Sequence, residues 1–331
     1  MFEPAVATQR VETDPSIDGK KRRILTLSKC VVSAALICWI LGDTSLGEVF
    51  TAVRSANIPL LLLAISLDSV GCFLTACRWR RLLKAQGVDA SMQFVLKSCM
   101  VGVFFNNILP STIGGDAIRA YDCWRLGLSK ACAVAVVFVD RFLGLVALML
   151  FVLYALVAFN QLMANLPLPY VWVLLGAAGM FVVVWTIFTP SQQISALIGN
   201  IGLPLSQKLQ NVLNKIVNGF LAFRGRKDAL ATALGLSLIL QLNVVLQYYL
   251  IAKALGFPIS LHVFFLIIPL AIFTMMIPVS INAIGIRENV LAFFFAMFGV
   301  SKSEAIAFAW LLYGIAIFWG SLGGIVYVFR R

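Results

Sequence analysis

The chain has 331 residues, of which 61% are hydrophobic and 12% are charged, and its formal net charge is +12. A soluble protein of this length is about half apolar and about a quarter charged, so this composition excludes a soluble globular protein. It predicts an all-α, polytopic membrane helix bundle, because no Asp, Glu, Lys or Arg occurs between Phe142 and Gln207. Basic residues cluster at the ends of apolar spans, as in membrane proteins that follow the positive-inside bias, so we expect no nucleic-acid partner.

The N-terminal part divides into a tail and the start of a membrane domain. Residues 1–23 are polar and end in four consecutive basic residues, which predicts a disordered cytoplasmic tail rather than a cleaved signal peptide. Residues 24–331 are expected to form a single integral membrane domain, with its first span at 24–41. Residues 43–57 predict a short amphipathic helix at the membrane surface.

About seven full spans are expected in all. After the first, the apolar segments lie at 58–77, 131–159, 170–188, 230–255, 261–276 and 305–329. A basic amphipathic segment near 190–228 is expected on the cytoplasmic membrane surface, facing anionic lipid. We expect the protein to lie in the inner (plasma) membrane, and the charge bias predicts that both termini are cytoplasmic. In the last span, Gly320, Gly323 and Gly324 predict close packing against another helix.

Two stretches, Phe104–Tyr121 and Ile277–Val290, break the spanning pattern. Each places proline, asparagine, glycine and opposite charges in apolar surroundings, with Pro110, Pro278 and Gly285 as the structural breaks. Non-helical backbone at membrane depth is tolerated only where protein buries it or water reaches it. Breaks at matching places of two halves point to a transporter-like binding site. The charge bias favours a re-entrant hairpin for the first break, so the fold prediction is about seven spans plus two re-entrant elements.

The first break carries charges with a regular spacing. Asp116, Arg119, Asp122 and Arg125 stand three residues apart, and Asp116 occupies an N-cap position after Gly114 and Gly115. Glycines permit a ligand to approach the backbone, and a helix N-terminus with free amides attracts anions. These features predict a pocket for a phosphate-bearing headgroup. The alternative is that Asp116 and Arg119 form a structural pair that caps a broken helix.

Adjacent charges occur at Asp140–Arg141 and at Arg287–Glu288. Neighbouring residues on a helix point about 100° apart, so neither pair can neutralise itself and each charge needs a partner on another segment. We expect Asp116, Arg119, Arg141, Arg287 and Glu288 to neutralise one another around a wet cavity. The alternative is an interfacial location for these charges. Other polar residues within spans, Asp68, Gln241, Asn243 and Gln247, are expected to bond across helices.

No enzyme signature accompanies these residues. The chain has one histidine and no CxxC pair, and GxSxG, GxxxxGK[ST] and HExxH are absent from the sequence. We therefore expect no catalytic residue, no metal and no cofactor.

Three segments, LPSTIGGDAIRAY, VFVDRFLGL and IPVSINAIGIREN, together with RWRRLLKAQG, resemble the lysylphosphatidylglycerol synthase transmembrane, or flippase-like, family over nearly the whole chain. The polar positions of the family map here onto Arg78, Asn106, Pro110, Gly114, Gly115, Asp116, Arg119, Asp140, Arg141, Gly144, Pro278, Gly285, Arg287 and Glu288. The candidate substrate-binding residues are Asn106, Gly114, Gly115, Asp116, Arg119, Asp140, Arg141, Arg287 and Glu288, with Asn282 added from the second break.

The resemblance implies lipid handling. In family members with a soluble aminoacyl-transferase domain, the membrane region moves the modified lipid between leaflets. This sequence ends at Arg331 directly after a span, so lipid aminoacylation is not expected. The leading hypothesis is a translocase for a phosphate-bearing lipid (a phospholipid, polyprenyl-linked glycolipid or hopanoid-related lipid). Arg119, Arg141 and Arg287 would hold the phosphate, and Asp116 and Glu288 would orient those arginines. The alternatives are an integral membrane enzyme that uses a lipid-phosphate donor, and a non-catalytic scaffold for a lipid-modifying enzyme or glycosyltransferase.

Overall fold

The computed structural model describes residues 46–108, 114–158, 225–276 and 283–329, together with the single residues 179 and 223. Within these ranges the fold is entirely helical, which confirms the predicted class. Several predictions lie outside the described residues: the tail at 1–23, the spans at 24–41 and 170–188, most of the basic segment near 190–228, and Pro110, Pro278 and Asn282.

The described residues form nine helices. They are α2 (Leu46–Arg54), α3 (Ile58–Ala85), α4 (Met92–Ile108), α5 (Gly114–Arg125), α6 (Lys130–Ala158), α11 (Lys227–Ala254), α12 (Leu261–Met275), α13 (Ile286–Ala296) and α14 (Lys302–Phe329). Four of them, α3, α6, α11 and α14, are long and apolar enough to cross a membrane. The predicted span at 261–276 is the 15-residue helix α12. At 1.5 Å per residue it reaches roughly 22 Å, less than the roughly 30 Å of a hydrocarbon core, so α12 is not a full span by itself.

The first break is a hairpin whose arms, α4 and α5, run antiparallel. Near the break, the backbone N–H of Gly115 donates to Asn106 Oδ1 at 2.8 Å. Toward the open end, the hydroxyl of Ser98 donates to the carboxylate of Asp122. The chain therefore enters and returns on one side, which confirms the re-entrant interpretation of this stretch.

The second break has the same form. The arms α12 and α13 bring Phe264 and Phe295 together, with ring centroids 5.9 Å apart. Before α13 the backbone turns through left-handed conformations at Ala283 (φ 57°) and Gly285 (φ 83°). The carboxylate of Glu288 then accepts a hydrogen bond from the N–H of Gly285 at 2.7 Å, which caps the second arm.

These elements form an internal repeat. The unit α3–α4–α5–α6 has the same order of long, short, short and long helices as the unit α11–α12–α13–α14. The first long helix ends at a left-handed glycine in both units, Gly87 (φ 84°) and Gly256 (φ 80°), within the matching sequences KAQGVDAS and KALGFPIS. The hairpin is likewise followed by Gly127 (φ 98°) and Gly299 (φ 77°), within LGLSK and FGVSK. The two halves are thus structural copies.

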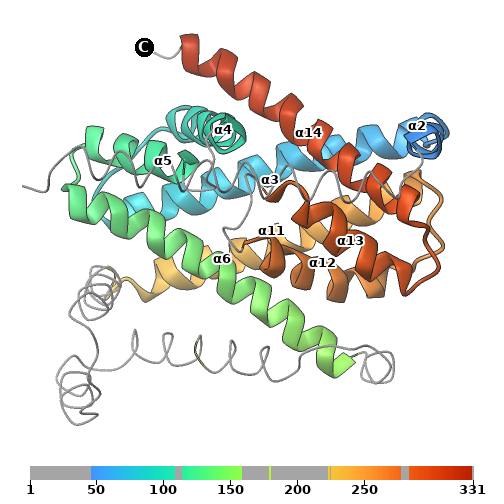
Figure 1. The fold of residues 1–331 in the computed structure, drawn as a ribbon. Coiled ribbons are helices and arrows are strands. Elements are labelled where there is room, and N and C mark those ends of the chain that lie inside the picture. Colours follow the sequence, from blue (N-terminus) through green and yellow to red (C-terminus); the bar gives the residue numbers. More distant parts are fainter. Residues whose placement is uncertain are drawn as a thin grey trace, which may run out of the picture.

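The two units are inverted relative to each other. Helices α3 and α11 lie side by side and antiparallel (Figure 1), because the N–H of Asn57 donates to the carbonyl of Ala254 at one end and Arg81 pairs with Asp228 at the other. Helix α4 packs against α14, and its counterpart α12 packs against α6. A pseudo-two-fold axis across the α3–α11 pair therefore relates the units, an arrangement typical of secondary transporters.

The described residues form two large hydrophobic cores, each drawn mainly from one unit and completed by residues of the other, such as Ala64 and Leu230. One surrounds Trp79 and Val139, and the other surrounds Phe264, Phe295 and Phe308. The rings of Phe295 and Phe308 meet edge to face with centroids 5.0 Å apart.

Close contacts join α14 to the first hairpin. A Cβ atom on Gly323 would collide with the carbonyl oxygen of Met100, and one on Gly324 would lie 2.8 Å from the ring of Phe104. These contacts confirm the predicted close packing of the last span. The predicted surface helix is also confirmed, as α2, whose Val49 is 2% exposed and packs against Ile306.

Candidate functional site

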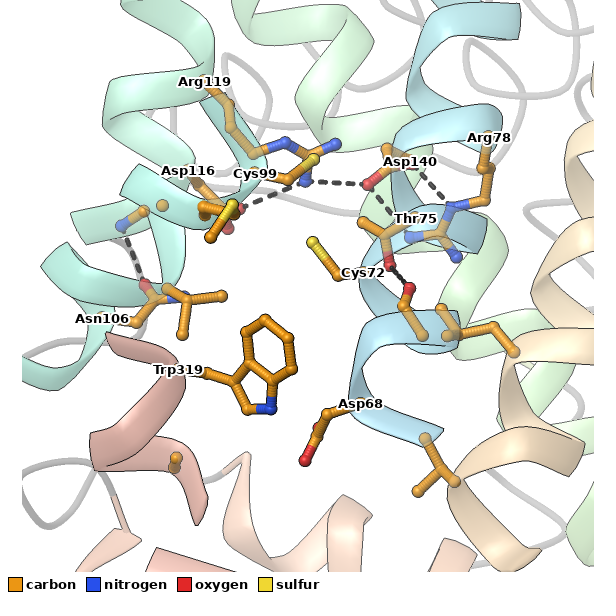
Figure 2. A pocket seen from close by; sticks show the side chains of 18 of the residues that line it. Asp68, Cys72, Thr75, Arg78, Cys99, Asn106, Asp116, Arg119, Asp140 and Trp319 are labelled. Atoms are coloured by element: carbon orange, nitrogen blue, oxygen red, sulfur yellow. Dashed lines mark hydrogen bonds and ion pairs between the residues drawn. The ribbon is translucent and has the colours of Figure 1, made fainter. Parts of the chain in front are cut away.

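A buried carboxylate, Asp140, joins three helices. Its side chain is fully buried, and it accepts two hydrogen bonds from Arg78 of α3, from Nε at 2.7 Å and from Nη2 at 3.1 Å. Arg119 of α5 reaches the same carboxylate with Nη1 at 3.0 Å (Figure 2). Arg78 also donates from Nη1 to the hydroxyl of Ser237 on α11 at 2.8 Å. Because bidentate arginine–carboxylate pairs fix both partners, Asp140 acts as the hub that holds α3, α5 and α6 together.

A second carboxylate, Asp116, binds Arg141. The Nε atom of Arg141 lies 2.8 Å from Oδ2 and 3.0 Å from Oδ1 of Asp116, and Nη1 of Arg119 lies 3.9 Å from Oδ1. The side chain of Arg141 is 47% exposed, whereas those of Arg78 and Arg119 are 7% exposed. Arg141 is therefore the guanidinium of this network that a ligand can reach.

The adjacent charges of α6 bond in different directions, as expected for neighbours on a helix. Asp140 bonds to Arg78 and Arg119, and Arg141 bonds to Asp116. The guanidinium of Arg119 also lies over the ring of Trp79, 4.7 Å from its centroid. Within the described part of the chain its Nε and Nη2 atoms have no hydrogen-bond acceptor. The indole face supplies a cation–π contact in place of those hydrogen bonds.

The start of α5 differs from the prediction. Helix α5 begins at Gly114, so Asp116 lies in its first turn rather than at the N-cap. The N–H of Gly115, in the first turn of α5, donates to Asn106 Oδ1. A Cβ atom on Gly115 would collide with the carbonyl oxygen of Gly102 and lie 2.8 Å from Asn106 Oδ1. Glycine is needed here for the close approach of α4 to α5.

This network forms one end of a cavity, the first hollow, of about 380 Å³. Figure 2 shows Arg119, Asp140 and Arg78 along one end of it, Asp68 at the opposite end and Trp319 projecting between them. Side chains from α3, α4, α5, α6, α11 and α14 line the hollow, among them Asn106, Gly115, Asp116 and Arg141. The inverted units therefore enclose a charged hollow where they meet.

A second hollow, of about 390 Å³, adjoins the first. Arg287 and Ala283 from the second break line it, together with Tyr248. The two hollows have four lining residues in common, Asp68, Arg141, Gln247 and Ala316, which we call the shared wall. The two breaks thus face adjoining hollows, although they do not contribute to a single charge cluster.

The predicted membership of the cluster is accordingly wrong in part. Glu288 caps Gly285 and forms no ion pair with an arginine among the described residues. Arg287 lies over the ring of Tyr313, 5.7 Å from its centroid, at the second hollow. The physical reason is that the inverted repeat places the second break across the α3–α11 pair from the first.

Arg78 was expected only through the family resemblance, and its burial was not predicted. A usable signal was present, because Asp68, Gly71, Cys72, Thr75 and Arg78 recur at helical spacing on one face of α3, and all five line the first hollow. The predicted cross-helix bonds are confirmed for Asn243 and Gln247 of α11. Gln247 Nε2 donates to Asp68 Oδ2 at 2.6 Å, and Asn243 Nδ2 donates to the carbonyl of Leu67 at 3.0 Å.

Comparison with known proteins agrees with the sequence resemblance. The family model for the lysylphosphatidylglycerol synthase TM region matches residues 26–323. A UPF0104 membrane protein of Methanothermobacter thermautotrophicus is 24% identical over 297 residues, which are 84% of this chain and 86% of that protein. A UPF0104 membrane protein of Methanocaldococcus jannaschii is 27% identical over 128 residues, 38% of each chain. The polytopic helical fold and the extent of the family match lead to one conclusion: the chain belongs to the family of the lysylphosphatidylglycerol synthase TM region.

Proposed function

We propose that the protein moves a phosphate-bearing lipid headgroup between the leaflets of the plasma membrane while the acyl chains stay in the bilayer. The observation that carries this proposal is the first hollow, a charged cavity inside a membrane helix bundle with Arg78, Arg119 and Arg141 in its lining. Intramembrane charges that line a cavity mark substrate pathways in membrane proteins. A volume of about 380 Å³ is within the range of small-ligand sites.

The arginines have different roles in this proposal. Arg78 and Arg119 are fixed by Asp140 and form the rigid end of the hollow. Arg141 is paired with Asp116 and is half exposed. A guanidinium binds phosphate with the same planar, bidentate geometry as carboxylate, so a headgroup phosphate can take the place of Asp116 at Arg141. Asp116 would then keep Arg141 in position between transport events.

The repeat supports transport rather than simple binding. Inverted units with broken helices at their interface recur in secondary transporters, where one unit rocks against the other around the substrate. Here each unit contributes one broken hairpin, and both units contribute residues to the lining of each of the two adjoining hollows. A headgroup that passes from one hollow to the other along the shared wall would cross the centre of the bundle.

The test is leaflet exchange in liposomes that contain purified protein and a fluorescent phosphatidylglycerol, read with a membrane-impermeant quencher. Arg141→Gln should slow exchange about tenfold or more, because losing one charge-assisted contact costs about 1.5–3 kcal/mol. Arg141→Lys should retain part of the rate, since it keeps the charge without the bidentate geometry. The matched control is Arg81→Gln, which removes an arginine that is 40% exposed and pairs with Asp228 away from the hollows.

Two outcomes would overturn the proposal. One is a wild-type exchange rate in Arg141→Gln at equal protein content. The other is a new covalent lipid product when the probe is recovered and chromatographed, which would identify an enzyme instead. Recovery of unmodified probe on the opposite leaflet is the expected result.

A further inference from the structure

Asp68 lies within a membrane span, and the hydrogen-bond partner of its carboxylate is a neutral side chain. It lies in α3, and its carboxylate accepts a hydrogen bond from the amide of Gln247 on α11, at 2.6 Å. No ion pair reaches Asp68 from the described residues. The shared wall places it beside both hollows.

The internal repeat shows what is unusual about this pair. Asp68 and Ser237 hold equivalent positions in the 28-residue helices α3 and α11, and so do Arg78 and Gln247. The contact between Arg78 and Ser237 is therefore the pseudo-symmetric copy of the contact between Gln247 and Asp68. In the Arg78–Ser237 contact, Asp140 neutralises the charge of Arg78. In the Gln247–Asp68 contact, the neutral Gln247 takes the place of the arginine, so the charge of Asp68 is not neutralised by its partner.

Asp68 also sets the charge balance of the site. Among the described residues, the first hollow is lined by three arginines, Arg78, Arg119 and Arg141, and by three carboxylates, Asp68, Asp116 and Asp140. The second hollow is lined by Arg141, Arg287 and Asp68. An ionised Asp68 leaves the first hollow neutral, and a protonated Asp68 makes it positive by one charge.

We propose that Asp68 is a proton-binding site that couples headgroup movement to proton movement, an inference that rests on the proposed function. With Asp68 ionised, the first hollow has no excess positive charge, and a phosphate passing the shared wall would meet a like charge. One proton from water neutralises the carboxylate, the phosphate passes from one hollow to the other, and the proton leaves to water afterwards. One proton then accompanies the single negative charge of a phosphodiester, so the step is electrically neutral.

Other groups face Asp68 or share its hollows. Besides the paired residues Arg78, Asp116, Arg119 and Asp140, they are Cys72 of α3, Cys99 of α4, Arg141 of α6, Gln247 and Tyr248 of α11, Arg287 of α13 and Trp319 of α14. The arginines keep their charge throughout the accessible pH range, and the thiols and the phenol are neutral in acid, so Asp68 is the carboxylate of the shared wall that can respond.

The experiment measures phosphatidylglycerol exchange in liposomes from about pH 5 to about pH 8, with a pH-sensitive dye trapped inside. The wild-type rate should fall about tenfold per pH unit once the pH exceeds the value at which Asp68 is half protonated. Asp68→Asn, a neutral mimic of the protonated acid, should exchange lipid at a nearly constant rate and without proton movement. Asp228→Asn, which removes an exposed carboxylate at the start of α11, should keep the wild-type profile.

A second variant tests the same site if Asp68→Asn folds poorly. Gln247→Arg introduces the cation that the other unit has at the equivalent position, which holds Asp68 ionised, so the rise in rate should move to lower pH. The inference is overturned if wild-type exchange does not depend on pH, or if both variants keep the wild-type profile. If the wild-type protein shows no lipid exchange at any pH, the proposed function itself is refuted. A parallel arm uses liposomes loaded with inorganic phosphate: a pH-dependent phosphate flux that is lost in Asp68→Asn would support the proton site but assign it to a soluble anion.

Discussion

The substitution Asp140→Asn tests whether one buried carboxylate holds the charged network together. Asp140 is fully buried and accepts hydrogen bonds from both Arg78 and Arg119. Asparagine keeps the size of the side chain but removes its negative charge, which leaves two buried guanidinium groups next to each other. In the described part of the chain the nearest remaining carboxylate is Asp116, 3.9 Å from Arg119.

The expected cost follows from this burial. Breaking a buried ion pair by removing one partner costs about 3–5 kcal/mol, which is a large part of the roughly 5–15 kcal/mol that stabilises a typical protein. The same helix α3 provides an internal control at its end, where Arg81 pairs with Asp228 at 3.2 Å and the Asp228 side chain is 70% exposed. Asp228→Asn should therefore cost only about 0.2–1 kcal/mol, as exposed pairs do.

The assay is reversible unfolding of the purified protein in detergent micelles, with the free energies of the two variants compared with that of the wild type. The double variant Arg78→Gln, Asp140→Asn should regain part of the loss, because glutamine can still donate to Ser237 and one of the two unpaired cations is gone. The expected coupling is about 0.5–3 kcal/mol. Equal losses for Asp140→Asn and Asp228→Asn would refute the reasoning, since burial would then not determine the cost.

Three further predictions concern the hairpins and their packing. Gly115→Ala should lower the thermal midpoint and the exchange rate together, because its Cβ would collide with the carbonyl of Gly102, whereas Gly235→Ala, with open space around it, should leave both unchanged. Gly323→Ala should separate α14 from α4 and reduce the amount of folded protein in the membrane, and Gly314→Ala, also in open space, is its control. Glu288→Gln should keep near-wild-type stability because the amide oxygen still accepts a hydrogen bond from Gly285. Glu288→Ala should lower the stability by about 0.5–2 kcal/mol, as the loss of a helix cap does. A loss for Glu288→Gln as large as that for Glu288→Ala would show that the charge itself is needed.

The first hairpin could be predicted because two independent signals agreed. Proline and glycine marked the break, and the charge bias required Arg119 and Arg125 to return to the side from which the chain entered. The composition of the second break predicts a re-entrant element, but the apolar pattern of 261–276 alone predicts a full span. A 15-residue apolar arm and a span have the same local pattern, so the observed length of α12 and the contact of Phe264 with Phe295 are needed to separate them.

The partners within the site could not be predicted in the same way. Helical spacing shows which residues share a face of one helix, but it does not show which helices meet. The sequence does not show that Asp140 of α6 lies beside Arg78, so the burial of Arg78 could not be predicted from it. Glu288 looked like a partner for arginines, although its own backbone neighbour Gly285 is nearer. The repeat is visible in the sequence, since KAQGVDAS and KALGFPIS stand at equivalent points, and aligning these two segments places Arg78 opposite Gln247.

The inversion of the two units also bears on how the chain becomes oriented during synthesis. Lysines at equivalent positions, such as Lys130 and Lys302, lie on opposite faces of an inverted repeat, so their effects on insertion oppose each other. Orientation must then be set by charges that the copies do not share. Arg80 and Arg81 lie in the last turns of α3, where α11 has Tyr249 and Leu250, and they are one such difference between the copies.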